Sequence, residues 1–243
     1  DIDLFEDDVL SFQRVLDMRA GVLSREFVIR REKGTVRVFF ERFVSLARPE
    51  LLALRCRVTA DYDCKVALIP AIDADVRNED SNYEEAFWLF EGEDEDRDGV
   101  LSVRTRTREN PFGTPRFSVC GAMAAEPTEK LKKNRVTVEE GYVARKFVFE
   151  AEAGQTVGCD KFVCVATDRD HKEDELTQAA TAGVLSAQQA GYDALRREQE
   201  RAWARRWEKA DVRIDGDVAG QQGIRFNIFQ LFSTYYGEDA RLN

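Results

Sequence analysis

The stretch QQGIRFNIFQL at residues 221–231, which runs on as FSTYYG to residue 237, decides how the rest of the sequence is interpreted. Its apolar residues recur at the spacing of one helix face: Ile224, Ile228, Leu231 and Tyr235. Gly216-Asp217 offers a turn and an N-cap ahead of this helix, and Gly237 stands where the helix would end. Three phenylalanines cover much of the remaining circumference, so such a helix must be buried on several sides. Because the sequence supplies few other helices, we expect this to be the first helix of a larger helical domain that is mostly absent.

Further strings, spread over the chain, agree with the helix stretch. They are LDMRAGVLSREF at 16–27, ERFVSLA at 41–47, DADVRNEDSNYEEAFW at 73–88, AWARRWEKADVRIDGD at 202–217 and TYYGEDARLN at 234–243. Together they closely resemble glycoside hydrolase family 65, and the helix stretch resembles the beginning of that family's catalytic barrel. The family holds the inverting disaccharide phosphorylases for maltose, trehalose, kojibiose and nigerose. The resemblance covers nearly the whole chain and does not rest on one short pattern.

Most of the chain before residue 168 shows the two-residue period of β-strands. Leu23, Phe27 and Ile29 alternate with polar residues up to a turn at Lys33-Gly34, and the return strand alternates again, which predicts a hairpin. Further strands are predicted over 52–58, 66–72 (where Pro70 indicates an edge or a bulge), 87–91, 100–107, 117–124, 143–149 and 157–166. Many short strands without intervening helices predict an antiparallel β-sandwich. The resemblance implies the large super-sandwich of the family's N-terminal domain.

The period changes to that of a helix after His171. Two stripes follow, with a break at Gly191: Leu176, Ala180, Val184 and Ala187 in the first, and Tyr192, Leu195, Gln199, Trp203 and Trp207 in the second. No Gly/Ser-rich or Pro-rich linker precedes them, so we expect these helices to pack onto the sandwich. The expected division is a sandwich over 1–168, a helical linker over 169–210 and, from the resemblance, the truncated start of an (α/α)6 barrel over 211–243.

Composition and charge disfavour several classes of partner. The chain has 243 residues, of which 43% are hydrophobic and 34% are charged, as in a globular protein with ample material for a core. Its 36 Lys and Arg residues against 46 Asp and Glu residues give a net charge of −10, which disfavours nucleic acid as a ligand. No apolar run reaches the length of a membrane span. We therefore expect neither nucleic acid nor membrane as a partner.

The cysteines indicate a reducing compartment. Their number is odd, none form a close CxxC pair, and most stand in apolar strand patterns: Cys56, Cys64, Cys120, Cys159 and Cys164. Reduced, buried cysteines in a cytoplasmic protein fit this pattern better than a disulfide framework does.

The densest polar cluster between strands contains Asp73, Asp75, Asn78, Glu79 and Asp80. A calcium loop needs oxygen ligands at alternating positions and a glycine at the sixth, where this chain has Asn78, so no metal ligand is assigned. The simpler interpretation is an ordered loop whose Asp and Asn side chains bond to their own backbone. The resemblance offers another, in which the loop helps to wall the pocket of the catalytic domain or of a neighbouring subunit. The side chains involved would be Asn78, Asp80, Asn82 and Tyr83.

For three other features, a structural role is favoured over a functional one. The acidic stretch 91–98 is interpreted as a solvated hairpin tip. His171 is the single histidine of the chain, so it can build neither a catalytic triad nor a histidine-rich metal site, and we expect it at a helix boundary. Trp203 and Trp207 are four residues apart and share a helix face, and core packing against the sandwich is favoured over stacking on a sugar ring.

Arg225 and Asn227 are polar residues flanked by apolar ones inside the helix stretch. Polar groups at a buried position need hydrogen-bond partners. We expect both to hydrogen-bond neighbouring helices or loops of the barrel.

The resemblance implies that the intact parent is an enzyme, a glycoside phosphorylase with inorganic phosphate as co-substrate and no cofactor. In such an enzyme phosphate attacks the anomeric carbon while a carboxylic acid protonates the leaving oxygen. The family's acid and its phosphate-binding loop lie downstream of the GEDARLN string, so no catalytic residue is assigned here. We expect the 243-residue chain alone to be inactive and the intact parent to be a homodimer that binds a disaccharide.

Two other hypotheses stay open. One keeps the family and makes the parent a hydrolase similar to trehalases, which the presence or absence of the downstream phosphate loop would decide. The other makes the chain an independent carbohydrate-binding or dimerisation module. The linkage of the disaccharide cannot be read from this sequence.

Overall fold

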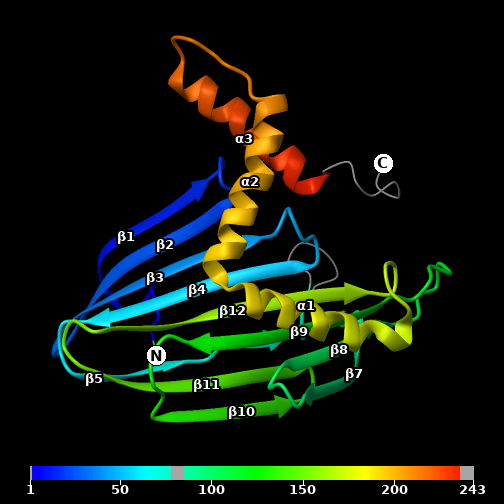
Figure 1. Cartoon of the computed structure of the whole chain (residues 1–243), viewed down its shortest axis with the longest axis horizontal. Helices are drawn as coiled ribbons and strands as arrows, with labels where there is room; N and C mark the ends of the chain where they lie inside the picture. Colours follow the sequence, from blue (N-terminus) through cyan, green and yellow to red (C-terminus); the bar gives the residue numbers. More distant parts are fainter. Residues whose placement is uncertain (1, 78–84, 236–243) are drawn as a thin grey trace.

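A large antiparallel sheet forms the middle layer of the molecule (Figure 1). The computed structural model describes residues 2–77 and 85–235. The sheet has the strand order β1-β2-β3-β4-β12-β9-β8-β7, with β1 (Asp8–Asp17), β2 (Val22–Arg31), β3 (Gly34–Val44), β4 (Leu51–Ala60), β7 (Trp88–Glu95), β8 (Leu101–Thr107), β9 (Ser118–Pro127) and β12 (Thr156–Thr167). A smaller sheet has the order β10-β11-β5, with β6 also paired to β11; its strands are β5 (Cys64–Leu68), β6 (Ala71–Asp73), β10 (Lys133–Glu139) and β11 (Tyr142–Ala151). The predicted antiparallel β-sandwich is confirmed.

The main core lies between the two sheets. Strand β11 presents Phe147 and Phe149, which are almost fully buried against β2, β3, β4 and β12. Their rings meet edge to face with centroids 6.5 Å apart. The inward residues of the facing strands alternate with outward polar ones, for example Phe27 and Ile29 on β2. The hydrophobic period seen in the sequence therefore places these side chains between the sheets.

Two helices cover the other face of the large sheet. Helix α1 (Leu176–Ala190) follows the short 3-10 helix η1 (Glu173–Glu175) and packs on β9 and β12, and α2 (Tyr192–Ala210) continues toward β4 (Figure 1). The predicted stripe of α1 is fully buried: Leu176, Ala180, Val184 and Ala187. The break between the helices falls at Gly191, which has a φ of +78° that glycine adopts without strain. The predicted packing of these helices onto the sandwich is confirmed.

The strand predictions agree with the structure except at the sheet edges. The predicted hairpin is β2–β3, with its two-residue turn at Glu32-Lys33. The predicted strand over 66–72 is divided at Pro70 into β5 and β6, because proline has no N–H to donate to the ladder. Two strands were not predicted, β1 and β10. Both lie at a sheet edge and bury few side chains, so their apolar alternation is weak.

The acidic stretch 91–98 differs from the prediction of a solvated hairpin tip. Strand β7 continues through it to Glu95, and only the turn around Asp96 to Gly99 forms the tip. The carboxylate of Glu93 accepts a hydrogen bond from the Gly141 backbone N–H at 2.7 Å. These acidic residues therefore help to hold the large sheet against the β10–β11 hairpin.

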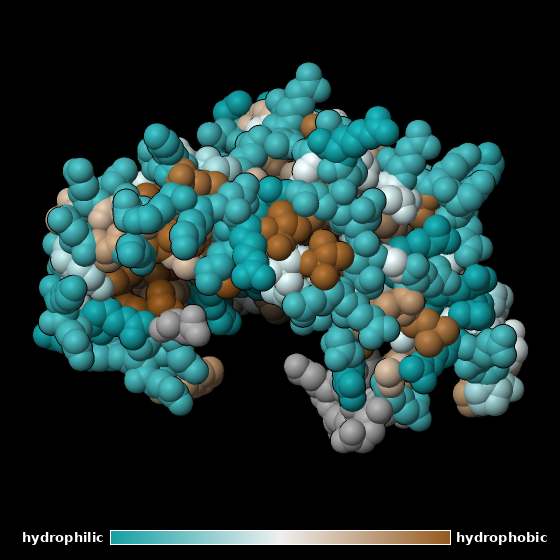
Figure 2. Space-filling view, turned by 90° about the horizontal axis from the view of Figure 1, so that it is seen from below, coloured by the Kyte–Doolittle hydropathy of each residue, from teal (hydrophilic) through white to brown (hydrophobic). Residues whose placement is uncertain are grey.

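Neither a membrane-spanning helix nor a cluster of metal ligands is present among the described residues. Among the helices of residues 2–77 and 85–235, none is both long enough and apolar enough to cross a bilayer. Within the same ranges no cluster of three His, Cys, Asp or Glu side chains could hold a metal ion. On the face seen in Figure 2, hydrophobic residues form several patches separated by hydrophilic ones.

All five cysteines are free thiols, and four of them are buried. Burial raises the pKa of Cys56 to about 12 and the pKa values of Cys159 and Cys164 to about 11. Burial also raises the pKa values of Cys64 and Cys120. Because the thiolate is the reactive form and Cys64 is the one cysteine that is not buried, we expect Cys64 alone to react with Ellman's reagent at about pH 8 in the native chain. All five should react in denaturant. The control is Cys64→Ser, and a fast-reacting thiol in that native variant would contradict the assigned burial.

Candidate functional site

A groove of about 720 Å³ opens between α3 (Val218–Thr234), α2 and one end of the large sheet. Its walls come from β1 to β4, the 45–50 loop and the two helices: Leu16, Gly21, Leu23, Arg42, Phe43, Val44, Ser45, Leu46, Pro49, Leu52, Leu54, Gln199, Trp203, Phe229, Phe232 and Ser233. The lining is mainly apolar. Figure 1 shows α3 crossing α2 at the end of the large sheet where β1 and β3 finish and the antiparallel strands β2 and β4 begin.

Helix α3 begins at the predicted N-cap but ends at Thr234, before the predicted Gly237, which lies outside the described residues, and it lacks the predicted burial. Its N-cap is Asp217, whose carboxylate accepts from the Gly220 N–H at 2.9 Å. None of its residues is buried. Val218 is 86% exposed, Leu231 70% and Phe226 43%. Only one face of the helix contacts the described part of the chain, so most of its apolar surface has no partner there.

Trp203 connects α2, α3 and the sheet. It is buried, and its indole ring stacks on Phe229 of α3 with centroids 4.6 Å apart. It also lies directly over Gly21, where a Cβ would come within 1.8 Å of the indole Nε1. Trp207, one turn further on, donates from Nε1 to the Met18 carbonyl at 2.8 Å. The core packing that the sequence favoured for this pair is confirmed for Trp203, whereas Trp207 is only partly buried.

Gln199 is a buried polar residue for which the sequence analysis predicted no role. Its Nε2 donates to the carbonyls of Gly21 and Val44, each at 3.0 Å, and its Oε1 accepts from the Leu46 N–H at 2.7 Å. One side chain of α2 thus satisfies backbone groups at the ends of β2 and β3. The signal in the sequence is an amide at a position of the α2 stripe otherwise filled by apolar residues.

Arg225 and Asn227 are not at the buried positions expected for them. Arg225 is half-exposed and forms a two-point ion pair with Asp211, at 2.8 and 2.7 Å, and Asn227 is exposed. Asp211 belongs to the segment that joins α2 to α3, and its pKa is lowered by the hydrogen bond from Arg225. The reason is that the face of α3 carrying Phe229 contacts α2, while Asn227 points elsewhere on a helix covered on one side.

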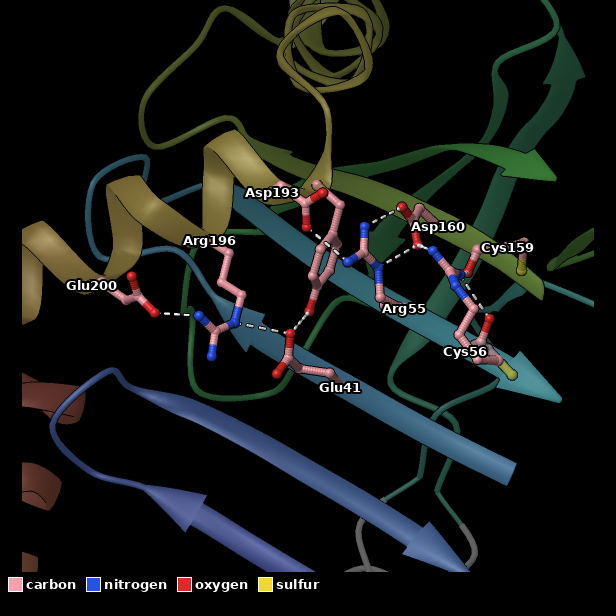
Figure 3. A network of polar contacts seen from close by, with 10 residues as sticks. Glu41, Arg55, Cys56, Cys159, Asp160, Asp193, Arg196 and Glu200 are labelled. Atoms are coloured by element: carbon pink, nitrogen blue, oxygen red, sulfur yellow. Dashed lines mark hydrogen bonds and ion pairs between the residues drawn. The ribbon is translucent and has the colours of Figure 1, made fainter. Parts of the chain in front are cut away.

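A charged network fixes α2 to the outer face of the sheet (Figure 3). Arg55 of β4 makes a two-point contact with Asp160 of β12, at 2.9 and 2.8 Å, and also reaches Asp193 at 2.7 Å. Its guanidinium lies 4.1 Å from the centre of the Tyr192 ring. The Tyr192 hydroxyl donates to Glu41 at 2.9 Å. Burial first, and then the Glu41 charge, raise the pKa of Tyr192 far above its usual range.

The sandwich and the two helices that cover it match a known domain. The sequence profile described as "Glycosyl hydrolase family 65, N-terminal domain" matches residues 1–206. The chain belongs to glycosyl hydrolase family 65. The predicted family is confirmed.

Two curated relatives of this family 65 chain are phosphorylases. The maltose phosphorylase of Bacillus subtilis (strain 168) is 43% identical over 244 residues, which cover 100% of this chain and 31% of the relative. The alpha,alpha-trehalose phosphorylase of Thermoanaerobacter brockii is 29% identical over 252 residues, which cover 100% of this chain and 32% of the relative. The chain therefore spans about a third of the length of these relatives.

A solved structure supports the fold of the family 65 chain. A putative kojibiose phosphorylase from the human microbiome superposes with a TM-score of 0.86 at 19% sequence identity. The match covers 98% of this chain and 30% of that one. Similarity at this level of identity shows a common fold.

The remaining predicted site residues of the family 65 chain are placed as follows. Asn78, Asp80, Asn82 and Tyr83 lie outside the described residues. Just before them, the Asp73 carboxylate accepts from the Asp75 N–H at 3.0 Å, the local backbone bonding expected of an ordered loop. His171 stands before η1, and its Nε2 lies 2.6 Å from Glu50 Oε1. The single histidine thus lies at a helix boundary, as expected, and it also contacts the 45–50 loop.

Proposed function

We propose that this chain is the N-terminal portion of an inverting disaccharide phosphorylase, which converts an α-linked glucose disaccharide and inorganic phosphate into glucose 1-phosphate and glucose. The observation that carries the proposal is α3, a helix with apolar side chains on all sides and no buried residue. The similarity over the full chain to phosphorylases about three times as long supports it. Maltose is the first substrate to test, because the 43% identical relative is a maltose phosphorylase.

The exposed apolar side chains of α3 would be stabilised by packing against another apolar surface. Val218 and Leu231, which are largely exposed, would each contribute up to about 1.5–3 kcal/mol on full burial, and the half-exposed Phe226 would contribute less. Helices of a catalytic domain that follows this chain would provide that cover. Arg225 and Asn227 would then be in reach of those helices, and Asn227 would gain the hydrogen-bond partners that a buried amide requires.

In this proposal, the acid and the groups that bind phosphate belong to a catalytic domain that follows this chain. Phosphate would be the nucleophile and co-substrate, and a carboxylic acid of the catalytic domain would protonate the leaving oxygen, with no further cofactor. The sandwich would support the barrel, and the loop with Asn78, Asp80, Asn82 and Tyr83 would wall its pocket or that of a second subunit. We propose a cytoplasmic homodimer for the intact enzyme, in which free thiols such as those of this chain remain reduced.

The decisive experiment compares the intact protein with the 243-residue chain. The intact protein is expected to release glucose 1-phosphate from maltose, trehalose, kojibiose or nigerose only when phosphate is present. The chain alone is expected to release none, because it carries no assigned acid and no phosphate loop. A coupled assay for glucose 1-phosphate, run beside an assay for glucose, measures both.

Three outcomes would contradict the proposal. Glucose release without dependence on phosphate would make the intact protein a hydrolase. Turnover by the isolated chain would show a catalytic centre within it. Tight binding of a disaccharide to the isolated chain in titration calorimetry, together with an inactive intact protein, would identify an independent carbohydrate-binding module.

A further inference from the structure

Three arginines share one face of the β1–β2–β3 sheet, on the side of the smaller sheet. In the strand register Arg14 of β1 is directly opposite Arg25 of β2. Arg25 is opposite Phe40 of β3, and Arg42 follows two residues later on the same face. Directly opposed side chains have Cβ atoms about 4.5–5.5 Å apart, and diagonal neighbours lie about 7–8 Å apart. Three guanidinium groups are therefore gathered in one small area.

Within residues 2–77 and 85–235, none of these three arginines has a hydrogen bond or an ion pair to a carboxylate. Other arginines of the same strands do have such partners. Arg30 pairs with Asp8 at 3.0 Å, and Arg37 pairs with Glu26 at 3.0 Å. Three cations without a carboxylate partner thus lie next to one another in a chain that carries a net charge of −10.

The electrostatic cost of this arrangement is visible at Arg25. Its pKa is lowered by burial first and then by the charges of Arg14 and Arg42. Like charges opposite one another weaken a sheet. The carboxylate of Glu41 on β3 does not offset them, because it faces α2 on the other side, where Tyr192 and Arg196 bond to it at 2.9 and 3.0 Å (Figure 3).

The three arginines line a depression of about 230 Å³. The other lining residues are Leu23, Ser24, Phe40, Glu41 and Leu54. The Arg25 guanidinium lies 5.0 Å from the centre of the Phe40 ring, which holds it over an aromatic face. The depression therefore combines a strongly positive rim with apolar walls. It is large enough for a small anion, since a water molecule takes up about 30 Å³.

We propose that Arg14, Arg25 and Arg42 bind a phosphoryl group, either as inorganic phosphate or as a phosphomonoester. Guanidinium groups donate paired N–H bonds to phosphate oxygens, and a dianion would offset the repulsion among three cations better than a single carboxylate would. In an ester, the organic part would lie against Leu23, Phe40 and Leu54. The site contains no reacting group of the proposed phosphorolysis, and its binding is measured without turnover.

The test is titration calorimetry of the 243-residue chain with inorganic phosphate and with glucose 1-phosphate, against chloride at equal ionic strength. We expect a Kd on the order of 1 mM for at least one of the two ligands. Arg25→Met should weaken that binding about tenfold or more, a loss of about 1.4 kcal/mol. The ligand-free variant should be at least as stable as the parent chain in urea, because it removes repulsion. Arg37→Met, on the opposite face, is the matched control and should leave binding unchanged.

Other results would overturn the assignment. Equal affinity of the parent chain and of Arg25→Met for the ligand would show that Arg25 does not bind it. If chloride at equal ionic strength gave the same heat as phosphate, the signal would come from non-specific ionic screening of the arginines. Binding to the chain but not to the intact protein would show that carboxylates of the remaining polypeptide occupy the arginines. Binding of only one of the two ligands would support the site and identify its source as free phosphate or as an ester.

Discussion

Replacing Trp203 by alanine is expected to lower the free energy of unfolding by about 3–5 kcal/mol. The indole is 3% exposed, covers Gly21 and stacks on Phe229, so its removal leaves a cavity where the sheet, α2 and α3 meet. Urea denaturation followed by far-UV circular dichroism measures the loss. Hydrogen exchange should show in addition that the amides of α3 lose protection, because the stacked ring joins α3 to α2.

Trp203→Phe is the matched control. It keeps an aromatic ring in place and removes an indole N–H that has no hydrogen-bond partner among the described residues. We therefore expect a loss of only about 1–2 kcal/mol. If Trp203→Ala cost less than about 1 kcal/mol, the tryptophan would not be the structural centre of this region.

Replacing Asp160 by alanine is expected to destabilise the chain by about 2–4 kcal/mol. Its carboxylate accepts from Arg55 at 2.9 and 2.8 Å and lies 2.8 Å from Arg57 Nη2. The side chains are only 15–22% exposed, so two cations would lose their main partner in a place poorly screened by water. The hydrogen bonds that Arg55 donates to the Asp160 carboxylate raise the pKa of Arg55, which therefore stays charged at any pH of interest.

The matched control for Asp160 is Asp8→Ala. Asp8 pairs with Arg30 at 3.0 Å on the same sheet, but both side chains are more than 60% exposed. Its removal should change the free energy of unfolding by less than about 1 kcal/mol, as is usual for exposed ion pairs. If both variants lost a similar free energy of unfolding, the partial burial of the Asp160 ion pairs would not make them more stabilising than an exposed pair.

Elements with a strong local pattern could be predicted from the sequence. The α1 stripe of Leu176, Ala180, Val184 and Ala187 is buried as its spacing indicated, and Asp217 caps α3 as its position ahead of the apolar run indicated. The edge strands β1 and β10 were missed because an edge strand buries few side chains and so carries a weak alternation. The apolar composition of α3 predicted a buried helix, but none of its residues is buried. The described part of the chain contacts only one face of this helix.

The sequence by itself determined the family, the antiparallel sandwich and the position of the helices, because periodicity, turn residues and separated motifs are local properties of a chain. Only the tertiary structure decided that Gln199 bonds three backbone groups where β2 begins and β3 ends, that Trp203 covers Gly21, and that Arg14, Arg25 and Arg42 meet on one face. These contacts join segments far apart along the chain. They depend on strand register and helix packing, which no short stretch of sequence encodes alone.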